Sequence, residues 1–419
     1  MRFSIMKERP FFFQPTAPVG ICAQLAGVFT EGQLKEAIAQ AMNAQRLMKT
    51  RVVLSGDGTA AYESTDAAVI SLQSFDCDFA QLLRQEESHV FDLEHGEYVR
   101  FFFRVQDDSV MLAALLHQLI ADCTGADLLM RDIAHALAGG SVPERPVQLY
   151  EPSWLPKGAS MPLSTRLSNK LGAMRWNKLK KSFSWDDRTR LAGRYWGWGT
   201  HATSLAVDAL SPEEFARLQA KAEEQGVSVY AAVMAALVYA TGRGQKVRYT
   251  DSVRPEGCTA LGNYDITYAF EFIYDPMTTL WNNAYAIEQL LAERQDNPVL
   301  RYNQLLLIGQ LPPTAVDAVY FSAYDSYKEP LANTYCHMFG LTHEPAGIAV
   351  TAMELTDDSR TMVLPAAPVP PSCAYAAAVC TFRKGLIVTL RTEIDCKPEE
   401  MQWLHEAMTT LRDACADME

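Results

Sequence analysis

A short polar segment from His117 to Cys123 holds the side chains of this sequence that are best suited to chemistry. The imidazole of His117 can take a proton from an attacking amine or hydroxyl group, or position that group. The carboxamide of Gln118 does not titrate in the useful range, so it can orient a reactant only by hydrogen bonding. Cys123 lies where a helix dipole lowers the pKa of a thiol in some proteins. The segment is therefore the candidate site.

Each of these side chains also has a structural interpretation. His117 would then be a buried histidine that supports the loop. Gln118 would be an inert replacement rather than a side chain that lines a site. We expect Asp122 to form a structural ion pair or a loop hydrogen bond, because a buried carboxylate needs such a partner. We expect Cys123 to be a small buried thiol rather than a nucleophile.

The elements around this segment are predicted clearly. Residues 98–105 and 110–116 are expected to be strands, and the second is a nearly continuous apolar run, as in a strand buried on both faces. A helix is expected from about Gly125 to Ala138, with Gly139 and Gly140 ending it. A polar segment between a buried strand and a helix is a common place for function.

Both halves of the chain begin with a strand followed by a capped helix. In the first half the strand covers residues 21–29, and Thr30 with Gln33 forms a capping box. In the second half the strand covers residues 203–207, and Ser211 with Glu214 forms the corresponding box. This order favours two similarly built lobes, although two copies are a weak repeat signal.

Residues 161–200 differ in composition from both halves and are expected to connect the lobes. They form a basic, aromatic stretch that runs from Arg166 to Arg194. One interpretation is a solvated linker helix. The other is a contact surface for an anionic partner, either the phosphates of coenzyme A or an acidic carrier protein bearing phosphopantetheine. The cations assigned to that surface are Arg175, Lys178, Lys180 and Lys181.

Composition excludes several classes of protein. The chain of 419 residues has a formal net charge of −13, which argues against broad nucleic-acid binding. There is no apolar run of 18 residues and no apolar signal-peptide core, so we expect no membrane span and no export. The nine cysteines include no CxxC pair, which is typical of reduced thiols in the cytoplasm. The histidines show no metal-ligand spacing, so no metal is expected.

The stretch FDLEHGEYVRFFFRVQDDSVMLAALLHQLIADCTGADLLMRDI resembles the condensation-domain family of non-ribosomal peptide synthetases, in which two strands lead to an HHxxxDG motif and a helix. Four other segments are similar to the family in the same order along the chain: QRLMKTRVV, SPEEFARLQAKAEEQGVSVYAAVMAALVYAT, DSVRPEGCTALGNYD and CAYAAAVCTFRKGLIVTLRTEI. The resemblance covers nearly the whole chain.

The resemblance implies an α/β fold of two chloramphenicol acetyltransferase-like lobes in a V arrangement with a central channel. The lobes would be residues 1–160 and 201–419, joined by residues 161–200. The first histidine of the motif corresponds to His117, and the second, which carries the catalytic role in the family, corresponds to Gln118. Cys123 replaces the glycine. Asp122 is retained, and Lys49 falls where the family has the arginine that pairs with it.

By resemblance, the expected activity is acyl transfer from a coenzyme A or carrier-protein thioester to a small amine or alcohol, with no bound cofactor. His117, Gln118 and Asp122 would form the catalytic site. Because Gln118 stands at the position of the usual base, a second class of function is open: a catalytically silent domain that binds a carrier protein or another enzyme. A third reading is a small-molecule binder that uses the same channel. We expect a monomer, because two lobes in one chain already supply both sides of the site.

Overall fold

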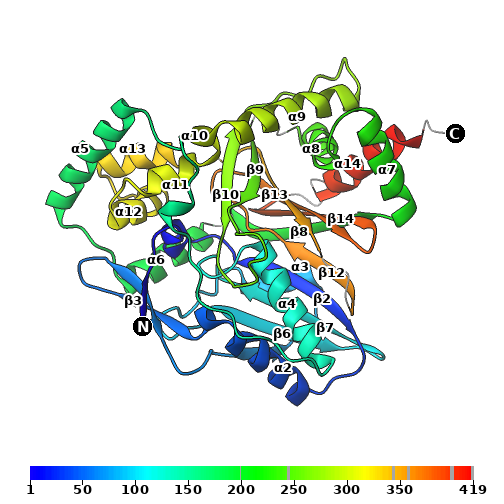
Figure 1. Ribbon diagram of the computed structural model, residues 1–419, viewed down its shortest axis with the longest axis horizontal. Helices are drawn as coiled ribbons and strands as arrows, with labels where there is room; N and C mark the ends of the chain where they lie inside the picture. The colour runs from blue at the N-terminus through cyan, green and yellow to red at the C-terminus, as the bar shows by residue number, and fades with distance from the viewer. Residues whose placement is uncertain (199, 243–245, 342–344, 356–358, 397–400, 417–419) are drawn as a thin grey trace.

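The computed structural model describes residues 1–198, 200–242, 246–341, 345–355, 359–396 and 401–416. Four strands of the first half of the chain and β12 from the second half form a five-stranded sheet in the order β12-β2-β7-β6-β5 (Figure 1). All eight residues of its central strand β7 are buried, as the apolar run predicts. The strands are β2 (Val19–Ala26), β5 (Ser71–Ser74), β6 (Val99–Val105), β7 (Ser109–Leu116) and β12 (Arg360–Ala366).

Two helices, α2 (Glu31–Ala44) and α4 (Cys123–Leu137), pack together beside this sheet. The predicted capping box at the start of α2 is confirmed, because Thr30 and Gln33 satisfy each other's backbone N–H groups. The first half also contains the helices α1 (Arg9–Phe12) and α3 (Phe79–Glu86) and a small sheet of β1 (Arg2–Ser4), β4 (Ala60–Ser64) and β3 (Thr50–Leu54).

The second half builds a six-stranded sheet in the order β10-β9-β11-β13-β14-β8. The strands are β8 (His201–Leu210), β9 (Val247–Ser252), β10 (Asp265–Phe270), β11 (Ile348–Glu354), β13 (Tyr375–Phe382) and β14 (Gly385–Ile394). Its helices are α7 (Pro212–Glu224), α8 (Val229–Thr241), α9 (Leu280–Asp296) and α14 (Trp403–Ala414). The predicted capping box of Ser211 and Glu214 opens α7 and is confirmed.

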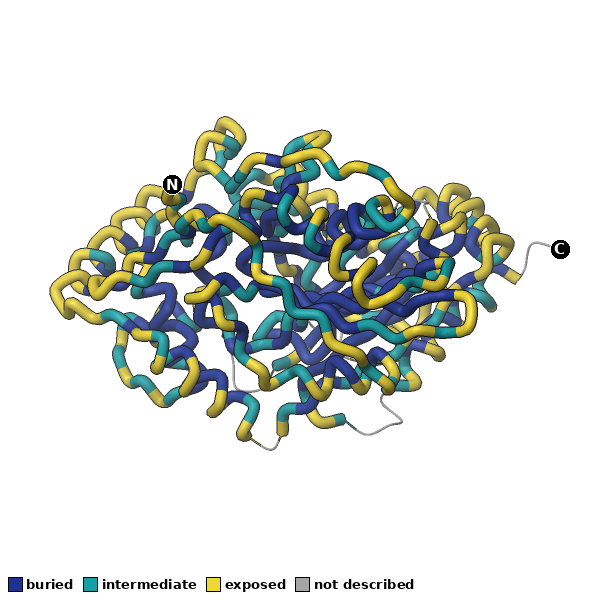
Figure 2. The backbone as a smooth tube through the Cα atoms, turned by 90° about the horizontal axis from the view of Figure 1, so that it is seen from below, coloured by how far each residue is buried: buried dark blue, intermediate teal, exposed yellow. Residues whose placement is uncertain are grey.

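The six-stranded sheet separates two hydrophobic cores. Along β13, Tyr375, Ala377 and Val379 belong to the core under α7, α8 and α14. The alternate residues Ala376, Ala378 and Cys380 belong to the larger core of the first half. This alternation follows from the pleat of a strand, whose successive side chains point to opposite faces. Figure 2 shows the buried strands running through the middle of the molecule with exposed segments outside them.

Several segments of the second half of the chain pack into the structure formed by the first half. Strand β12 pairs with β2 and is therefore an edge strand of the first sheet, although it belongs to the 201–419 part of the chain. The short helices α11 (Asn303–Ile308), α12 (Pro313–Tyr324) and α13 (Pro330–Met338), which follow α10 (Pro298–Arg301), contribute to the core of the first half. The two halves are thus interlocked.

The expected connection at residues 161–200 is a pair of helices, α5 (Leu163–Leu179) and α6 (Trp185–Gly197). Helix α5 lies beside α12 and α13 at one end of the molecule (Figure 1). Helix α6 runs from there toward the centre and contacts both α12 and β8. In the described part of the chain, no helix is both long enough and apolar enough to cross a bilayer.

Candidate functional site at the junction of the two halves

The predicted site loop connects β7 to α4. The strand ends at Leu116, and Asp122 is the N-cap of the helix, accepting a hydrogen bond from the backbone N–H of Gly125 through Oδ1. Helix α4 therefore begins two residues earlier than predicted, because the Asp122 side chain satisfies one of its first free N–H groups. A β-bridge between Ala121 and Gly262 joins the loop to the second half of the chain.

Asp122 is a structural residue whose carboxylate joins the two halves. Arg254 Nη2 lies 2.9 Å from Oδ1, and the backbone N–H of Tyr264 donates to Oδ2 at 2.9 Å. The expected ion pair between Lys49 and Asp122 is therefore wrong. Arg254 occupies the partner position, and Lys49 Nζ lies 3.7 Å from Glu144 at the surface instead. Arg254 belongs to the DSVRPEG segment, which sequence reasoning placed at the crossing between lobes without assigning its arginine.

His117 is held on both edges of its ring. Its side chain is 7% exposed, Nδ1 accepts from the backbone N–H of Leu119 at 3.1 Å, and Nε2 lies 3.2 Å from Nη2 of Arg188. A neutral imidazole has only one nitrogen lone pair that can accept a hydrogen bond, so the two donors compete for it. Burial lowers the pKa of His117 well below its ordinary value, and the charge of Arg188 lowers it further. The ring is therefore neutral, and its lone pair is already engaged.

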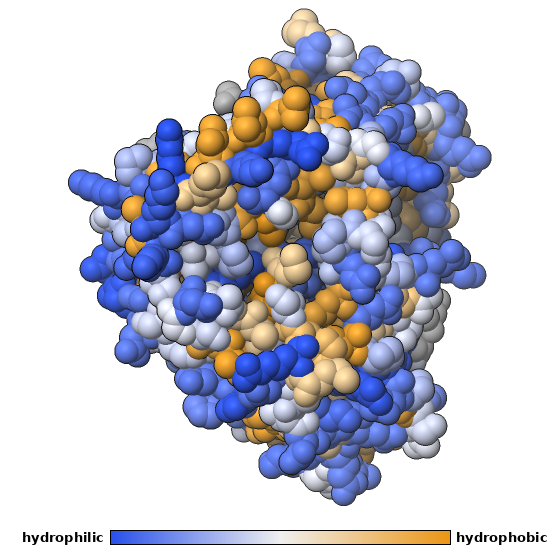
Figure 3. Space-filling view, turned by 60° about the vertical axis from the view of Figure 1, so that its left-hand side comes forward, coloured by the Kyte–Doolittle hydropathy of each residue, from blue (hydrophilic) through white to orange (hydrophobic). Residues whose placement is uncertain are grey.

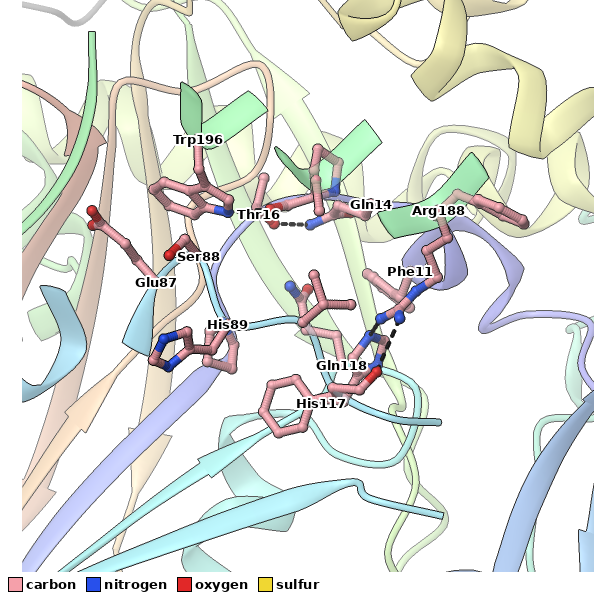
Figure 4. A pocket seen from close by; sticks show the side chains of 16 residues that line it. Phe11, Gln14, Thr16, Glu87, Ser88, His89, His117, Gln118, Arg188 and Trp196 are labelled. Atoms are coloured by element: carbon pink, nitrogen blue, oxygen red, sulfur yellow. Dashed lines mark hydrogen bonds between the residues drawn. The ribbon is translucent and has the colours of Figure 1, made fainter. Parts of the chain in front are cut away.

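Arg188 is a site residue that sequence reasoning grouped with the basic surface. It reaches from α6 toward His117 (Figure 4) and donates to the carbonyl oxygens of Phe12 and Phe91, each at 3.0 Å. Burial lowers the pKa of its guanidinium group to about 10, so it remains charged at neutral pH. The capping box of Ser184 and Asp187, one residue before Arg188, fixes the start of this helix.

Gln118 is tied into the loop chiefly by its backbone. Asn263 Nδ2 donates to its carbonyl oxygen at 2.8 Å, whereas its own carboxamide makes a long contact of 3.4 Å with the carbonyl oxygen of Ala17. The side chain is 8% exposed. Since a carboxamide has no titration in the useful range, this position can orient a group but cannot remove its proton.

Two small cavities meet at Gln118. The one next to His117, of about 40 Å³, is drawn in Figure 4. The other, of about 100 Å³, reaches Asp122 and strands of the second half. Phe11, Gln14 and Gln118 line both, so the two cavities share this part of their walls. Sites for small molecules usually measure about 300–1,000 Å³, and these two hold only a few waters each.

Asp265 is a titratable group in the larger of the two cavities. It lines that cavity together with Gln118 and Asp122. Burial raises the pKa of Asp265 well above its ordinary value, the neighbouring charge of Asp122 adds to this, and Lys7 opposes it. Nothing in the sequence singles out Asp265 except its place as the last residue of the DSVRPEGCTALGNYD segment.

The remaining predicted residues lie apart from these cavities or are inert. Arg175, Lys178, Lys180 and Lys181 are exposed on and just beyond α5, and none of them lines a cavity that reaches His117 or Gln118. Cys123 is buried, and burial raises the pKa of its thiol well above the ordinary value. The thiol therefore stays protonated and is no nucleophile, as the structural interpretation predicts.

Known structures share this architecture over the whole chain. No protein-family model and no curated protein sequence matches it. Polyketide synthase associated protein 5 from Mycobacterium tuberculosis superposes with a TM-score of 0.62 at 15% identity, covering 100% of both chains. The epimerization domain of tyrocidine synthetase B gives 0.63 at 12%, covering 100% of this chain and 97% of that one. The X-domain from teicoplanin biosynthesis gives 0.55 at 13%, covering 99% and 95%. The chain therefore has the fold of the condensation-type domains.

Proposed function

We propose that this protein is a condensation-type domain that binds an acidic partner, in the manner of a carrier-binding domain, without transferring an acyl group itself. The observation that carries the proposal is the state of the two residues at the motif position. Gln118 cannot accept a proton, and the imidazole of His117 is neutral with its lone pair engaged between Leu119 and Arg188. Acyl transfer would therefore lack the base that the related enzymes have at the position of Gln118.

The small volume at the junction supports the same conclusion. A thioester and its acceptor would have to meet beside Gln118, where the cavities measure about 40 and 100 Å³. Helix α6 holds the backbone around Phe11 and Gln14, which line both cavities, at two points. Arg188 bonds to the carbonyl oxygen of Phe12, and Trp196 Nε1 bonds to that of Pro15 at 3.0 Å. Opening the site would require these bonds to break.

Helix α5 is the surface that we assign to the partner. Leu163, Leu167, Leu171 and Met174 follow one another at helical spacing and are each 50% exposed or more. Seven lysines and arginines and no acidic residue lie between positions 157 and 181, in a chain whose net charge is −13. An apolar stripe flanked by cations suits an acidic protein with an apolar contact, such as a carrier protein bearing phosphopantetheine.

Calorimetric titration with an acidic carrier protein loaded with an acyl-phosphopantetheine tests this assignment. We expect saturable binding that is weakened about tenfold or more by the double change Arg175→Glu and Lys178→Glu, while the bound thioester stays intact. Arg217→Glu on the exposed face of α7 is the matched control and should bind like the wild type. Absence of binding, or equal binding by the α5 variant, would overturn the assignment.

Acyl transfer is the second candidate, and one observation favours it. Gln118 lines cavities on both of its sides, as a residue that meets a donor and an acceptor from opposite directions would. The base would then have to be another group, and Asp265 lines the second of these cavities. Thioester turnover that is lost in Asp265→Asn and retained in Arg217→Glu would support this candidate over the first.

A further inference from the structure

A third cavity, far larger than the two at Gln118, lies at the end of the molecule that carries α5. It measures about 530 Å³ and lies between the N-terminal segment, the loop before α5, and helices α11 and α12. Figure 3 brings these elements forward and shows a face on which apolar side chains border a hollow. Its volume falls in the range of about 300–1,000 Å³ that is typical of small-molecule sites.

The wall of this cavity is apolar and buried, and its mouth is exposed. Ile5, Met161, Leu306 and Val316 line it and are all less than 10% exposed. The mouth includes Met6, Ser160 and Arg166, which are open to solvent. Covering an aliphatic chain with such a wall is favourable, because it removes apolar surface from water.

The charged residues that line the cavity are all cations. They are Lys7, Arg9 and Arg166, and the described lining contains no Asp or Glu. Arg9 is paired with Asp317 and also donates to the carbonyl oxygen of Gly58, although its Nη1 has no partner in the described part of the chain.

Lys7 is buried at 4% exposure, and its Nζ bonds only to the carbonyl and side-chain oxygens of Asn263, at 2.6 and 3.2 Å. Among the described residues, no carboxylate lies within ion-pair distance of its ammonium group. The carboxylates of Glu8, Asp265 and Asp122 act on this charge from beyond ion-pair distance. An anion in direct contact would stabilise the ammonium group further, because the low dielectric strengthens the attraction.

We propose that this cavity binds a long-chain carboxylate, with the aliphatic chain along the wall of Ile5, Leu306 and Val316 and the carboxylate on Lys7. The geometry carries the assignment: the apolar enclosure has a suitable volume and its charged lining residues are all cations. One of them is a buried lysine that has no carboxylate within ion-pair distance among the described residues. This inference does not depend on whether the protein transfers acyl groups or docks a carrier.

Titration of the full-length protein with three amphiphiles of equal chain length, each below its micelle concentration, tests the site. The probes are dodecanoate, dodecanol and dodecyltrimethylammonium. We expect saturable binding of one dodecanoate per chain, binding of dodecanol weaker by about tenfold or more, and no binding of the cationic amphiphile. The tenfold ratio of the two affinities follows because dodecanol lacks the charged hydrogen bond between the carboxylate and Lys7, and such a bond contributes about 1.5–3 kcal/mol. Absence of saturable dodecanoate binding, or equal affinity for all three probes, would overturn the proposal.

Lys7→Met keeps an apolar side chain of similar length and removes the charge. It should abolish the preference for dodecanoate over dodecanol, whereas Arg166→Gln, at the exposed mouth, is the matched control and should keep it. If Lys7→Met retained the full preference, the carboxylate would not lie on Lys7 and the assignment would be wrong. If this variant failed to fold, Ala159→Phe, which adds bulk to the wall while leaving Lys7 in place, should weaken dodecanoate binding. Unchanged binding in that variant would also overturn the proposal.

Discussion

Asp122 and His117 lie five residues apart in one loop, and each is fixed by an arginine from a distant part of the chain. Arg254 neutralises the carboxylate of Asp122 and helps join the second half of the chain to the loop. Arg188 contacts the imidazole of His117 and disfavours its protonation. The first contact stabilises the junction of the halves, and the second removes the titration that acid–base catalysis would need.

The Asp122 contact predicts a large difference between two substitutions. Asp122→Ala should lower the free energy of unfolding by about 3–5 kcal/mol, because it leaves the part-buried Arg254 without its carboxylate partner and removes the N-cap of α4. Lys49→Ala should change it by less than about 0.5 kcal/mol, since its contact with Glu144 is at the surface. Urea unfolding measures both. If Lys49→Ala lowered the free energy of unfolding as much as Asp122→Ala does, Lys49 would be the partner of Asp122 in place of Arg254.

The depressed pKa of His117 predicts a pH dependence of stability. The unfolded chain takes up a proton on this residue below about pH 6.5, whereas the folded protein does so only at a lower pH. The contribution of neutral His117 to the free energy of unfolding is therefore fully present above pH 6.5. It decreases as the pH falls below 6.5, by up to about 1.4 kcal/mol per pH unit.

Urea unfolding of the wild type and of His117→Gln between pH 5 and 7 isolates this contribution, because all other groups are common to both proteins. The free-energy difference between them should shrink as the pH falls. A difference that stays constant over this interval would mean that His117 titrates normally in the folded protein.

The strand, loop and helix around the candidate site, and the expectation that Asp122 needs a hydrogen-bond or ion-pair partner, could be predicted from the sequence because both follow from local patterns. The buried strand before the loop and the helix after it were visible in 110–116 and 125–138. The arginines that contact the loop could not be predicted, since Arg254 lies 132 positions from Asp122 and Arg188 lies 71 positions from His117 in the sequence. Arg188 stands among exposed cations in the sequence, and only the packing of α6 against the N-terminal segment distinguishes it.

At the scale of the element, α5 has two unlike faces. Trp176 is buried, and its Nε1 donates to Thr314 Oγ1 at 2.8 Å, whereas Leu163, Leu167 and Leu171 point to solvent. The sequence of this region is compatible with a linker helix or with a contact surface. The helix is now shown, and the contact surface remains a proposal.

Paired substitutions on the two faces of α5 should separate its packing from its proposed docking role. Trp176→Ala should lower the free energy of unfolding by about 3–5 kcal/mol, because it opens a cavity in the core. Leu167→Ser should change that free energy by less than about 0.5 kcal/mol and should weaken carrier-protein binding. Unfolding and titration of the same preparations measure both effects. A large loss of stability in Leu167→Ser would mean that this face packs against the protein.

At the scale of the whole molecule, the interlocking of the halves explains what local patterns could not predict. The sequence predicts two lobes divided near residue 200, yet β12 completes the first sheet and residues of α11–α13 enter the core of the first half. An exchanged strand carries the same alternation of side chains as any other strand, so nothing local identifies the sheet that it joins. The fold class was predictable from the resemblance in segment order, and these crossings were not.

The interlocked halves enclose a junction at Gln118 with little free volume and no base at the motif position. The most direct test of this account follows free thiol released from acyl-coenzyme A and acyl-carrier thioesters in the presence of mixed amines and alcohols. Wild type is compared with Gln118→Ala and with Gln118→His, which restores an imidazole at the motif position. The account predicts that wild type and Gln118→Ala both release thiol at the rate measured without protein. Turnover by the wild type above that rate, lost in Gln118→Ala, would contradict it.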